Sequence, residues 1–256
     1  MNICIDVGNT TVNIGFFKED NLIDRITFNT DFKKTSDQFY SIIKQQIEIK
    51  NIDIKNVNNI IYSSVVPAIN LALKQAIKEI FNKDIMLISP GLKTGLIINV
   101  DNPNEIGNDL IADLVGAKEK YGAPSIICDL GTASKVLLLD KNNKFLSCLI
   151  TPGITLSAES LTHNAALLPE VSLETPKSIM AKNTIEAMNG GIVFGHALMI
   201  KGLVEKYEAE IGYKTKHILT GGGAIYVKDI LKDDFIYDRD LNLIGLNTLI
   251  KKNRGN

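Results

Sequence analysis

The sequence contains no tryptophan, few aromatic residues and only three cysteines, and each shortage excludes a class of protein. Aromatic residues make up 6% of the 256 residues, so the chain has little with which to build a stacking platform for nucleic-acid bases. Cys4, Cys128 and Cys148 are odd in number and lack C-x-x-C spacing. They argue against a disulfide scaffold or a thiolate zinc site and indicate a reducing compartment, so we expect a cytoplasmic protein.

An excess of charge of one sign is also missing. The 28 Lys and Arg residues nearly balance the 29 Asp and Glu residues, for a net charge of −1. We therefore expect no nucleic-acid partner and no binding to a membrane surface through a basic patch. We find no signal peptide and no apolar run of the roughly 18 residues that span a bilayer. The hydrophobic content of 45% is that of an ordinary globular protein.

The expected order of strands and helices begins again half-way along the chain. Two short strands flank the polar turn Gly8-Asn9-Thr10-Thr11, and a third strand follows at 22–29 before helices and strands alternate. The same opening recurs around Asp129-Leu130-Gly131-Thr132. This self-similarity predicts an α/β fold of two similar lobes, each a mixed sheet covered by helices. We place the lobes at residues 1–118 and 119–256.

The two equivalent turns have the residue types of a phosphate-binding site. An acid at a strand end, Asp6 or Asp129, can hold a cation or its water, and the glycine two residues later lets the backbone fold tightly against a ligand. One such turn alone is more often a plain hairpin turn, because Asn and Gly favour turns. Two copies in matching places favour a clamp on nucleotide phosphates.

A third glycine-rich segment follows a later strand. Thr220-Gly221-Gly222-Gly223-Ala224 is by itself an ordinary strand-to-helix turn, but together with the two phosphate turns it favours a base or ribose site. The chain has neither a G-x-x-x-x-G-K-[ST] loop nor a G-x-G-x-x-G fingerprint. The sequence therefore supports neither a Walker-type NTPase nor a Rossmann dehydrogenase.

A series of short motifs follows one another along nearly the whole chain. Each alone is a weak match, but the ordered set is highly specific: Asp6-Val7-Gly8-Asn9-Thr10 with Gly15, Lys93-Thr94-Gly95-Leu96, Asp101-Asn102-Pro103, Gly107-x-Asp109, Asp129-x-Gly131-Thr132-Ala133, Thr151-Pro152-Gly153-Ile154, Ala166 with Leu168-Pro169, Lys182-Asn183-Thr184 and Thr220-Gly221-Gly222. On these motifs the chain resembles the type III pantothenate kinases, members of the acetate-kinase, hexokinase and actin-like superfamily.

The resemblance implies a fold and an activity. The fold would be two ribonuclease-H-like, actin-like lobes with a cleft between them, in a homodimer whose interface helps to build the substrate pocket. The activity would be ATP-dependent phosphorylation of the pantothenate hydroxyl to 4'-phosphopantothenate, the first step toward coenzyme A. The cofactors would be ATP with Mg²⁺ and a monovalent cation, K⁺ or NH₄⁺.

The resemblance also implies roles for single residues. Asp109 falls on the catalytic base, Asp129 on the ligand of the monovalent cation and Thr184 on a pantothenate contact. The nucleotide contacts fall on Asp6, Val7, Gly8, Asn9, Thr10, Thr11, Val12, Asn13, Thr132, Gly221 and Gly222. The remaining substrate contacts are the neighbours of the base, Gly107, Asn108 and Leu110. A carboxylate can accept the proton of an attacking alcohol, although an acid in a first helical turn also interacts well with the helix dipole.

Departures from the family's pattern fall mainly on the pantothenate side. Leu110 replaces an arginine, Val100 a tyrosine and Ser147-Cys148 a Gly-Gly pair. Leucine cannot replace the charge and donors of arginine, so two alternatives stay open: a kinase of this fold for another small alcohol, or a catalytically silent, nucleotide-binding regulatory dimer. In the second phosphate motif Ser134-Lys135 replaces two threonines. Two alternatives stay open for Lys135: it offsets part of the lost charge, or it points to solvent, which we favour slightly.

Overall fold

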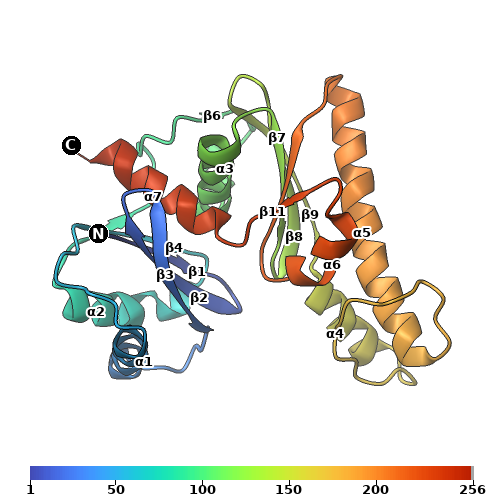
Figure 1. Ribbon diagram of the computed structural model, residues 1–256, viewed down its shortest axis with the longest axis horizontal. Helices are drawn as coiled ribbons and strands as arrows, with labels where there is room; N and C mark the ends of the chain where they lie inside the picture. The colour runs from blue at the N-terminus through green and yellow to red at the C-terminus, as the bar shows by residue number, and fades with distance from the viewer. Residues whose placement is uncertain (255–256) are drawn as a thin grey trace. The chain divides into compact units, whose positions relative to one another are not determined.

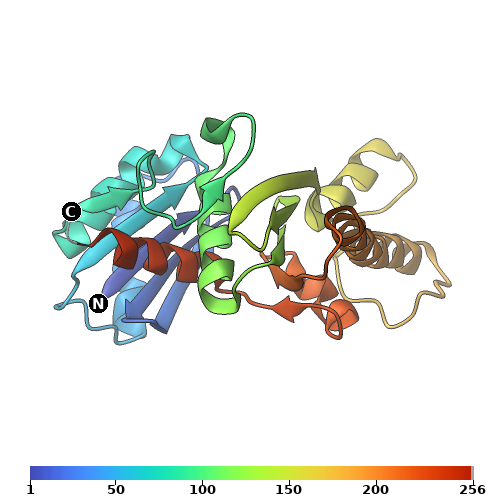
Figure 2. The ribbon, with the colours of Figure 1, turned by 90° about the horizontal axis from the view of Figure 1, so that it is seen from above.

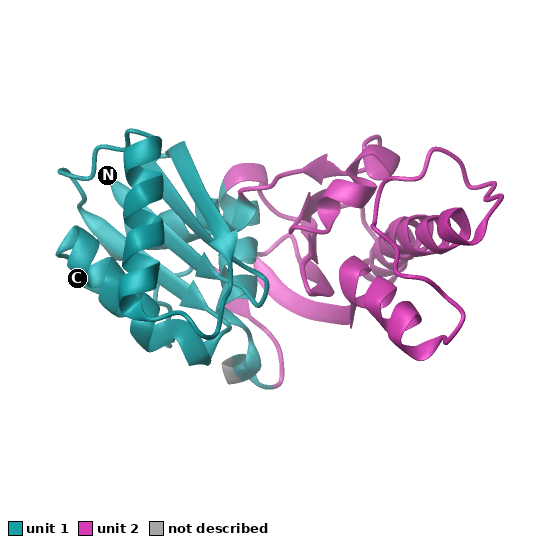
Figure 3. Ribbon diagram, turned by 90° about the horizontal axis from the view of Figure 1, so that it is seen from below, with its two compact units in different colours: residues 1–95, 102–119, 241–256 teal, residues 96–101, 120–240 magenta. Residues whose placement is uncertain are grey.

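The computed structural model describes residues 1–254 and divides into two compact units (Figure 3). Unit 1 comprises residues 1–95, 102–119 and the C-terminal segment from 241, and unit 2 comprises residues 96–101 and 120–240. The expected lobes were residues 1–118 and 119–256. In the structure the C-terminal segment belongs to unit 1 instead of the second lobe, and residues 96–101 belong to unit 2 instead of the first. The chain therefore passes between the units more than once.

Unit 1 is built on a mixed five-stranded sheet (Figure 1). Its strands, in their order across the sheet, are β3 (Asn21–Asn29), β2 (Thr11–Lys18), β1 (Asn2–Val7), β4 (Asn59–Ser64) and β5 (Ile85–Leu87). The meander β1–β2–β3 is antiparallel, whereas β4 pairs in parallel with both β1 and β5. The short turn between β1 and β2 is the first of the two expected phosphate turns.

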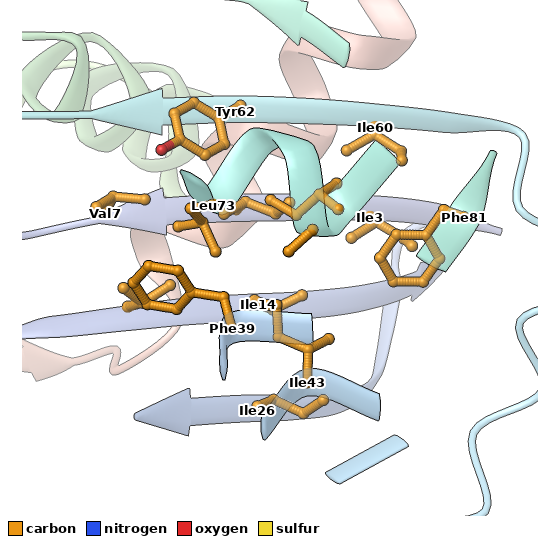
Figure 4. Close-up of a cluster of buried hydrophobic side chains, with 14 of the residues drawn as sticks. Ile3, Val7, Ile14, Ile26, Phe39, Ile43, Ile60, Tyr62, Leu73 and Phe81 are labelled. Atoms are coloured by element: carbon orange, nitrogen blue, oxygen red, sulfur yellow. The ribbon is translucent and has the colours of Figure 1, made fainter. Parts of the chain in front are cut away.

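Two helices, α1 (Ser36–Ile49) and α2 (Asn70–Phe81), cover one face of this sheet. Their apolar side chains lie over the alternate strand residues that point to the same face, with Phe39 of α1 beside Ile14 and Phe81 of α2 beside Ile3 (Figure 4). Helix α1 begins after its N-cap Thr35, whose side chain forms a capping box with Gln38.

The opposite face of the sheet carries the C-terminal helix α7 (Leu241–Asn253), which contacts β1, β2 and β4. Helix α3 (Asn108–Tyr121) crosses α7 where two glycines meet: a Cβ atom on Gly245 would lie 1.8 Å from the Ala112 carbonyl oxygen, and one on Gly116 would lie 2.4 Å from that of Leu241. No larger side chain fits at this crossing. The contact fixes α3, and with it Asp109, against the sheet of unit 1.

Unit 2 repeats the same plan. Its six strands, in order across the sheet, are β11 (Ile236–Tyr237), β10 (Lys216–Thr220), β7 (Ser125–Leu130), β8 (Ala133–Leu139), β9 (Lys144–Pro152) and β6 (Ile97–Ile98). Again an antiparallel meander, β7–β8–β9, is joined by a strand parallel to its first member, β10. The prediction of two similar mixed sheets covered by helices is confirmed.

Three helices, α4 (Ile154–Asn164), α5 (Thr184–Ile211) and α6 (Ala224–Leu231), form the core of unit 2 with β7, β8 and β10. Figure 2 shows α5 nearly end-on, with α4 beside it. Helix α5 has 28 residues and a mean hydropathy of 1.3 over its most apolar window. By length and composition alone it could cross a membrane, whereas no such apolar run was expected from the sequence. Nearly half of that window is buried inside the protein, as in a core helix.

Candidate active site

The expected second phosphate turn lies between β7 and β8, and backbone from two other segments packs against it. A Cβ atom on Gly153, which precedes α4, would lie 2.3 Å from the Gly131 carbonyl oxygen. One on Gly221, at the end of β10, would lie 2.5 Å from Asp129 Oδ1. Gly221 also has a φ of +87°, a conformation that glycine adopts without strain. The structure thus brings together Asp129, Gly131 and Thr132 with the Gly221–Gly222 segment.

Hydrogen bonds hold these three segments in place. The Gly153 amide donates to the Thr132 carbonyl oxygen at 3.0 Å, and the Gly223 amide donates to that of Leu130 at 2.7 Å. Gly153 and Gly223 are the N-caps of α4 and α6, so two helices begin beside the turn. Amides at helix N-termini carry partial positive charge and bind anions such as phosphate.

Lys135 forms an ion pair with Asp129 at this turn. The two residues are directly opposite in the antiparallel β7–β8 register, which puts both side chains on the same face of the sheet. Lys135 Nζ donates to Asp129 Oδ2 at 2.8 Å, and the side chains are only 19% and 13% exposed. The expectation that Lys135 points to solvent is wrong, because the strand register directs it to Asp129.

This ion pair bears on whether a monovalent cation fits beside Asp129. A cation held by the same carboxylate would lie about 4 Å from Lys135 Nζ, where two unit charges repel each other by about 4 kcal/mol at an effective dielectric constant near 20. The residues present at Asp129 therefore do not fit a bound K⁺ or NH₄⁺.

The first phosphate turn, in unit 1, is closed by a hydrogen bond from the Gly8 amide to the Thr11 carbonyl oxygen at 3.0 Å. Thr30 anchors it: its hydroxyl donates to the Gly8 carbonyl oxygen at 2.6 Å and its amide to that of Thr10 at 2.9 Å. Asn9 and Thr10, at the tip of the turn, are exposed. This leaves the tip of the turn open to a ligand.

Not every expected nucleotide contact can be a side-chain contact. Val7 and Val12 are fully buried in the hydrophobic core of unit 1, so only their backbone could reach a nucleotide. Asn13 accepts a hydrogen bond from the Thr27 hydroxyl at 2.9 Å, and Asp6, at the end of β1 opposite Asn13, is half-buried.

Asp109 lies in the first turn of α3 and is half-exposed. Its side chain turns back along the chain, since a Cβ atom on Gly107 would lie 2.3 Å from Asp109 Oδ1. A Cβ atom at residue 107 would therefore require the Asp109 carboxylate to turn away from its present position. Asn242 of α7 donates to the Asp109 carbonyl oxygen and to Asp113 Oδ1, each at 3.1 Å, which ties this turn to the neighbouring helix.

The start of α3 bears on one of the expected substrate contacts. The helix begins at Asn108, after the separate 3₁₀ turn Pro103–Glu105. Leu110, expected among the substrate contacts, is only 8% exposed. Its side chain is buried, so only its backbone could reach a substrate. Gly107 and Asn108 are half-exposed.

The fourth expected region, around Thr184, borders a pocket of unit 2. The pocket has a volume of about 860 Å³ and lies between α4 and α5. Its lining is mainly apolar with a few polar groups: Pro152, Leu156, Ser157, Ser160, Leu161, Leu168, Thr184, Ala187, Met188, Gly191, Ile192, Gly195 and His196. Such a lining is typical of small-molecule sites.

The pocket is linked to the second phosphate turn by two consecutive residues of the chain, Pro152 and Gly153. Pro152 lines the pocket and accepts a hydrogen bond from His196 Nε2 at 3.0 Å, and the next residue, Gly153, packs on the turn. Sequence reasoning missed Ser157 and Ser160. Their spacing of three residues, which puts both on one face of a helix that follows a glycine N-cap, was the available signal.

Comparisons with known proteins agree along the whole chain. A family model described as type III pantothenate kinase matches residues 2–206. The type III pantothenate kinase of Exiguobacterium sp. (strain ATCC BAA-1283 / AT1b) is 36% identical over 254 residues, which cover 99% of this chain and all of that protein. The type III pantothenate kinase of Halalkalibacterium halodurans is 35% identical over 253 residues, with the same coverage.

Solved structures share the fold at lower identity. A protein from Campylobacter jejuni assigned to the Baf family of transcriptional activators has a TM-score of 0.60 at 22% identity and covers 98% of both chains. The archaeal actin homologue Ta0583 has a TM-score of 0.50 at 13% identity, covering 98% of this chain and 99% of its own. These likenesses show an actin-like fold and no more.

Proposed function

The chain belongs to the type III pantothenate kinase family, and from that premise we propose how its residues serve the reaction. The activity is that of a phosphotransferase: ATP, with a divalent metal ion, phosphorylates pantothenate in the first step of coenzyme A biosynthesis. The single observation that carries this function is the match to curated relatives over the full length of both chains. The comparisons favour neither of the two alternatives left open by the sequence.

Asp109 is the proposed general base. A primary alcohol must lose its proton as it attacks the γ-phosphate, and a carboxylate within hydrogen-bond reach can accept that proton. Support comes from the half-exposed position of Asp109 and from the contacts of Gly107 and Asn242 that fix its turn.

The two turns are the proposed phosphate-binding elements. In unit 2 the support is the gathering of Thr132, Gly221 and Gly222 beside the first residues of α4 and α6. In unit 1 the support is the closed Gly8 turn with exposed Asn9 and Thr10. Most of the rate would come from alignment of the alcohol and neutralisation of phosphate charge.

Mg²⁺ would arrive with ATP as part of the substrate. Asp6 fits its water shell, because it is a half-exposed carboxylate at the end of β1 beside the first turn. No step is assigned to a monovalent cation. The resemblance implies that Asp129 holds K⁺ or NH₄⁺, but here Asp129 forms an ion pair with Lys135.

Pantothenate is proposed to bind in the pocket between α4 and α5, with Thr184 as one contact. We also infer a homodimer. Apolar side chains around this pocket are exposed, among them Leu156 (42%), Leu161 (39%), Ile185 (43%) and Leu198 (62%). Exposed apolar surface at one place is typical of a protein–protein interface. Three free thiols, two of them buried, support a cytoplasmic location.

A substrate-dependent assay tests the function. The purified protein should release ADP from ATP–Mg²⁺ only when pantothenate is added, and mass spectrometry should find pantothenate carrying one added phosphate. A panel of other small primary alcohols serves as the control. ATP binding without turnover of pantothenate, or faster turnover of another alcohol, would contradict the proposal.

A further inference from the structure

The positively charged side chain of Lys135 lies beside the second phosphate turn of unit 2. Lys135 lies in β8, opposite Asp129 of β7, and its ammonium group donates to Asp129 Oδ2 at 2.8 Å. Both side chains are mostly buried. Side chains that face each other across two paired strands are held by the sheet itself, unlike the long exposed side chains of a surface ion pair.

The Asp129 carboxylate is enclosed on its other sides by backbone. Oδ1 lies 2.5 Å from the position of a Cβ atom on Gly221, and both oxygens lie within 4 Å of that on Gly131. A carboxylate at this place faces the same backbone amides that are proposed to bind phosphate. Without a positive partner it would repel an anionic ligand, and its burial would be unfavourable.

We propose that Lys135 supplies this positive charge from the chain itself, so that phosphoryl transfer by this enzyme does not depend on a monovalent cation. The inference rests on the proposed function of the turn. Lys135 acts as a positioning residue: its ammonium group neutralises Asp129 and keeps the carboxylate oriented against Gly221, which leaves the amides of the turn free to bind phosphate.

The charge balance supports this role. One carboxylate and one ammonium group together have a net charge of zero. A carboxylate with one bound K⁺ would have the same net charge. Lysine differs from an ion in solution because its charge is covalently attached and always present at the site. A chain with this lysine therefore has no charge left for a monovalent cation to neutralise at Asp129.

The test compares cations and variants in the full-length enzyme. ADP release with pantothenate and ATP–Mg²⁺ is measured in buffers whose monovalent cation is K⁺, NH₄⁺, Na⁺ or only tetramethylammonium. The wild type should give the same rate in all four. Lys135→Thr should lose about 10-fold or more in tetramethylammonium, on the scale of a lost electrostatic contact, and K⁺ or NH₄⁺ should restore it.

Two further variants separate this role from a merely structural one. Lys135→Arg keeps a positive charge and should stay independent of the cation. Lys206→Thr makes the same change at an exposed position of α5 and should behave as the wild type. Thermal melts show whether each variant folds. If Lys135→Thr does not fold, the comparison of wild-type rates in the four buffers decides whether the enzyme depends on a monovalent cation.

Wild-type turnover that requires K⁺ would overturn this inference and leave the proposed function standing. A folded Lys135→Thr variant that is slow and gains nothing from K⁺ or NH₄⁺ would also overturn it. An enzyme that does not phosphorylate pantothenate in any of the four buffers would overturn the proposed function, and this inference with it.

Discussion

Gly221 lies so close to Asp129 that a Cβ atom on the glycine would be 2.5 Å from the carboxylate oxygen Oδ1. The contact joins the end of β10 to the end of β7, two strands that pair in parallel through Thr220 and Asp129. A positive φ of +87° at Gly221 allows this approach. The glycine-rich segment is thus part of the same construction as the second phosphate turn.

Replacement of Gly221 by alanine should destabilise the protein by about 1–3 kcal/mol, because a Cβ atom adds strain at a positive φ and a clash with Asp129. The matched control is Gly222→Ala, where a Cβ atom would have nothing within 4 Å and φ is not in the left-handed region. Urea unfolding of both variants checks this. Equal stabilities would show that the Gly221 contact is not a tight one.

A second prediction concerns acid stability and Glu208 of α5, which is only 5% exposed. Burial alone would raise its pKa, but hydrogen bonds from Lys214, His217 and the Thr215 backbone lower the pKa from 4.5 to about 2. A carboxylate whose pKa is lowered on folding stabilises the folded state above the unfolded pKa, and this stabilisation is lost as the pH falls below about 4.5 toward 2.

The free energy of unfolding should therefore fall by about 3 kcal/mol across that pH range from this group. Glu208→Gln should be less stable at pH 7 and should show a flatter decline below pH 4.5. Denaturant unfolding at a series of pH values gives both curves. Parallel curves for the wild type and the variant would mean that Glu208 is not the group responsible.

A third prediction concerns Leu110. Leu110 lies where the family usually has an arginine, and together with Val100→Tyr the change Leu110→Arg was expected from the sequence to improve pantothenate binding, but the Leu110 side chain is only 8% exposed. Leu110→Arg should instead destabilise the protein by several kcal/mol, about the scale of a buried unpaired charge. Leu110→Met, which keeps the volume, should cost less than about 1.5 kcal/mol. A lower KM for pantothenate in a stable Leu110→Arg variant would contradict this account.

A fourth prediction concerns the pocket between α4 and α5. Thr184→Val removes one hydroxyl from its lining and keeps the shape of the side chain. If that hydroxyl binds pantothenate, the KM for pantothenate should rise by about 3- to 10-fold, the scale of one neutral hydrogen bond. The KM for ATP serves as the internal control and should not change. An unchanged KM for pantothenate would remove Thr184 from the site.

Local sequence patterns were sufficient for the two meanders and their turns, but not for the short edge strands β6 and β11. Alternation of apolar residues around Gly8 and again around Gly131 predicted both meanders, because period two is a property of the strand itself. The packing of the C-terminal helix could not be predicted in this way. Nothing local to residues 241–253 indicates that α7 packs in unit 1, since that depends on Gly116 and Gly245, which are far apart in sequence.

The residues of the candidate site also divide into those indicated by local motifs and those that depend on tertiary contacts. Asp109, the two turns and the glycine segment were indicated by motifs that are short and contiguous. Lys135 was misjudged, because its direction depends on which residue of β7 lies opposite, a tertiary fact. Likewise the burial of Leu110 and the opening of the pocket beside Ser157 and Ser160 arise from helix packing and not from the motif around each residue.

The most direct measurement compares the wild type with Asp109→Asn in single-turnover formation of 4'-phosphopantothenate. The substitution keeps the size of the side chain and removes the base, so the rate should fall by about 100-fold or more, while ATP binding measured by calorimetry stays unchanged. Glu119→Gln, which removes a carboxylate near the far end of the same helix, should keep the full rate. A near-normal rate for Asp109→Asn would contradict the assignment of the base and the mechanism built on it.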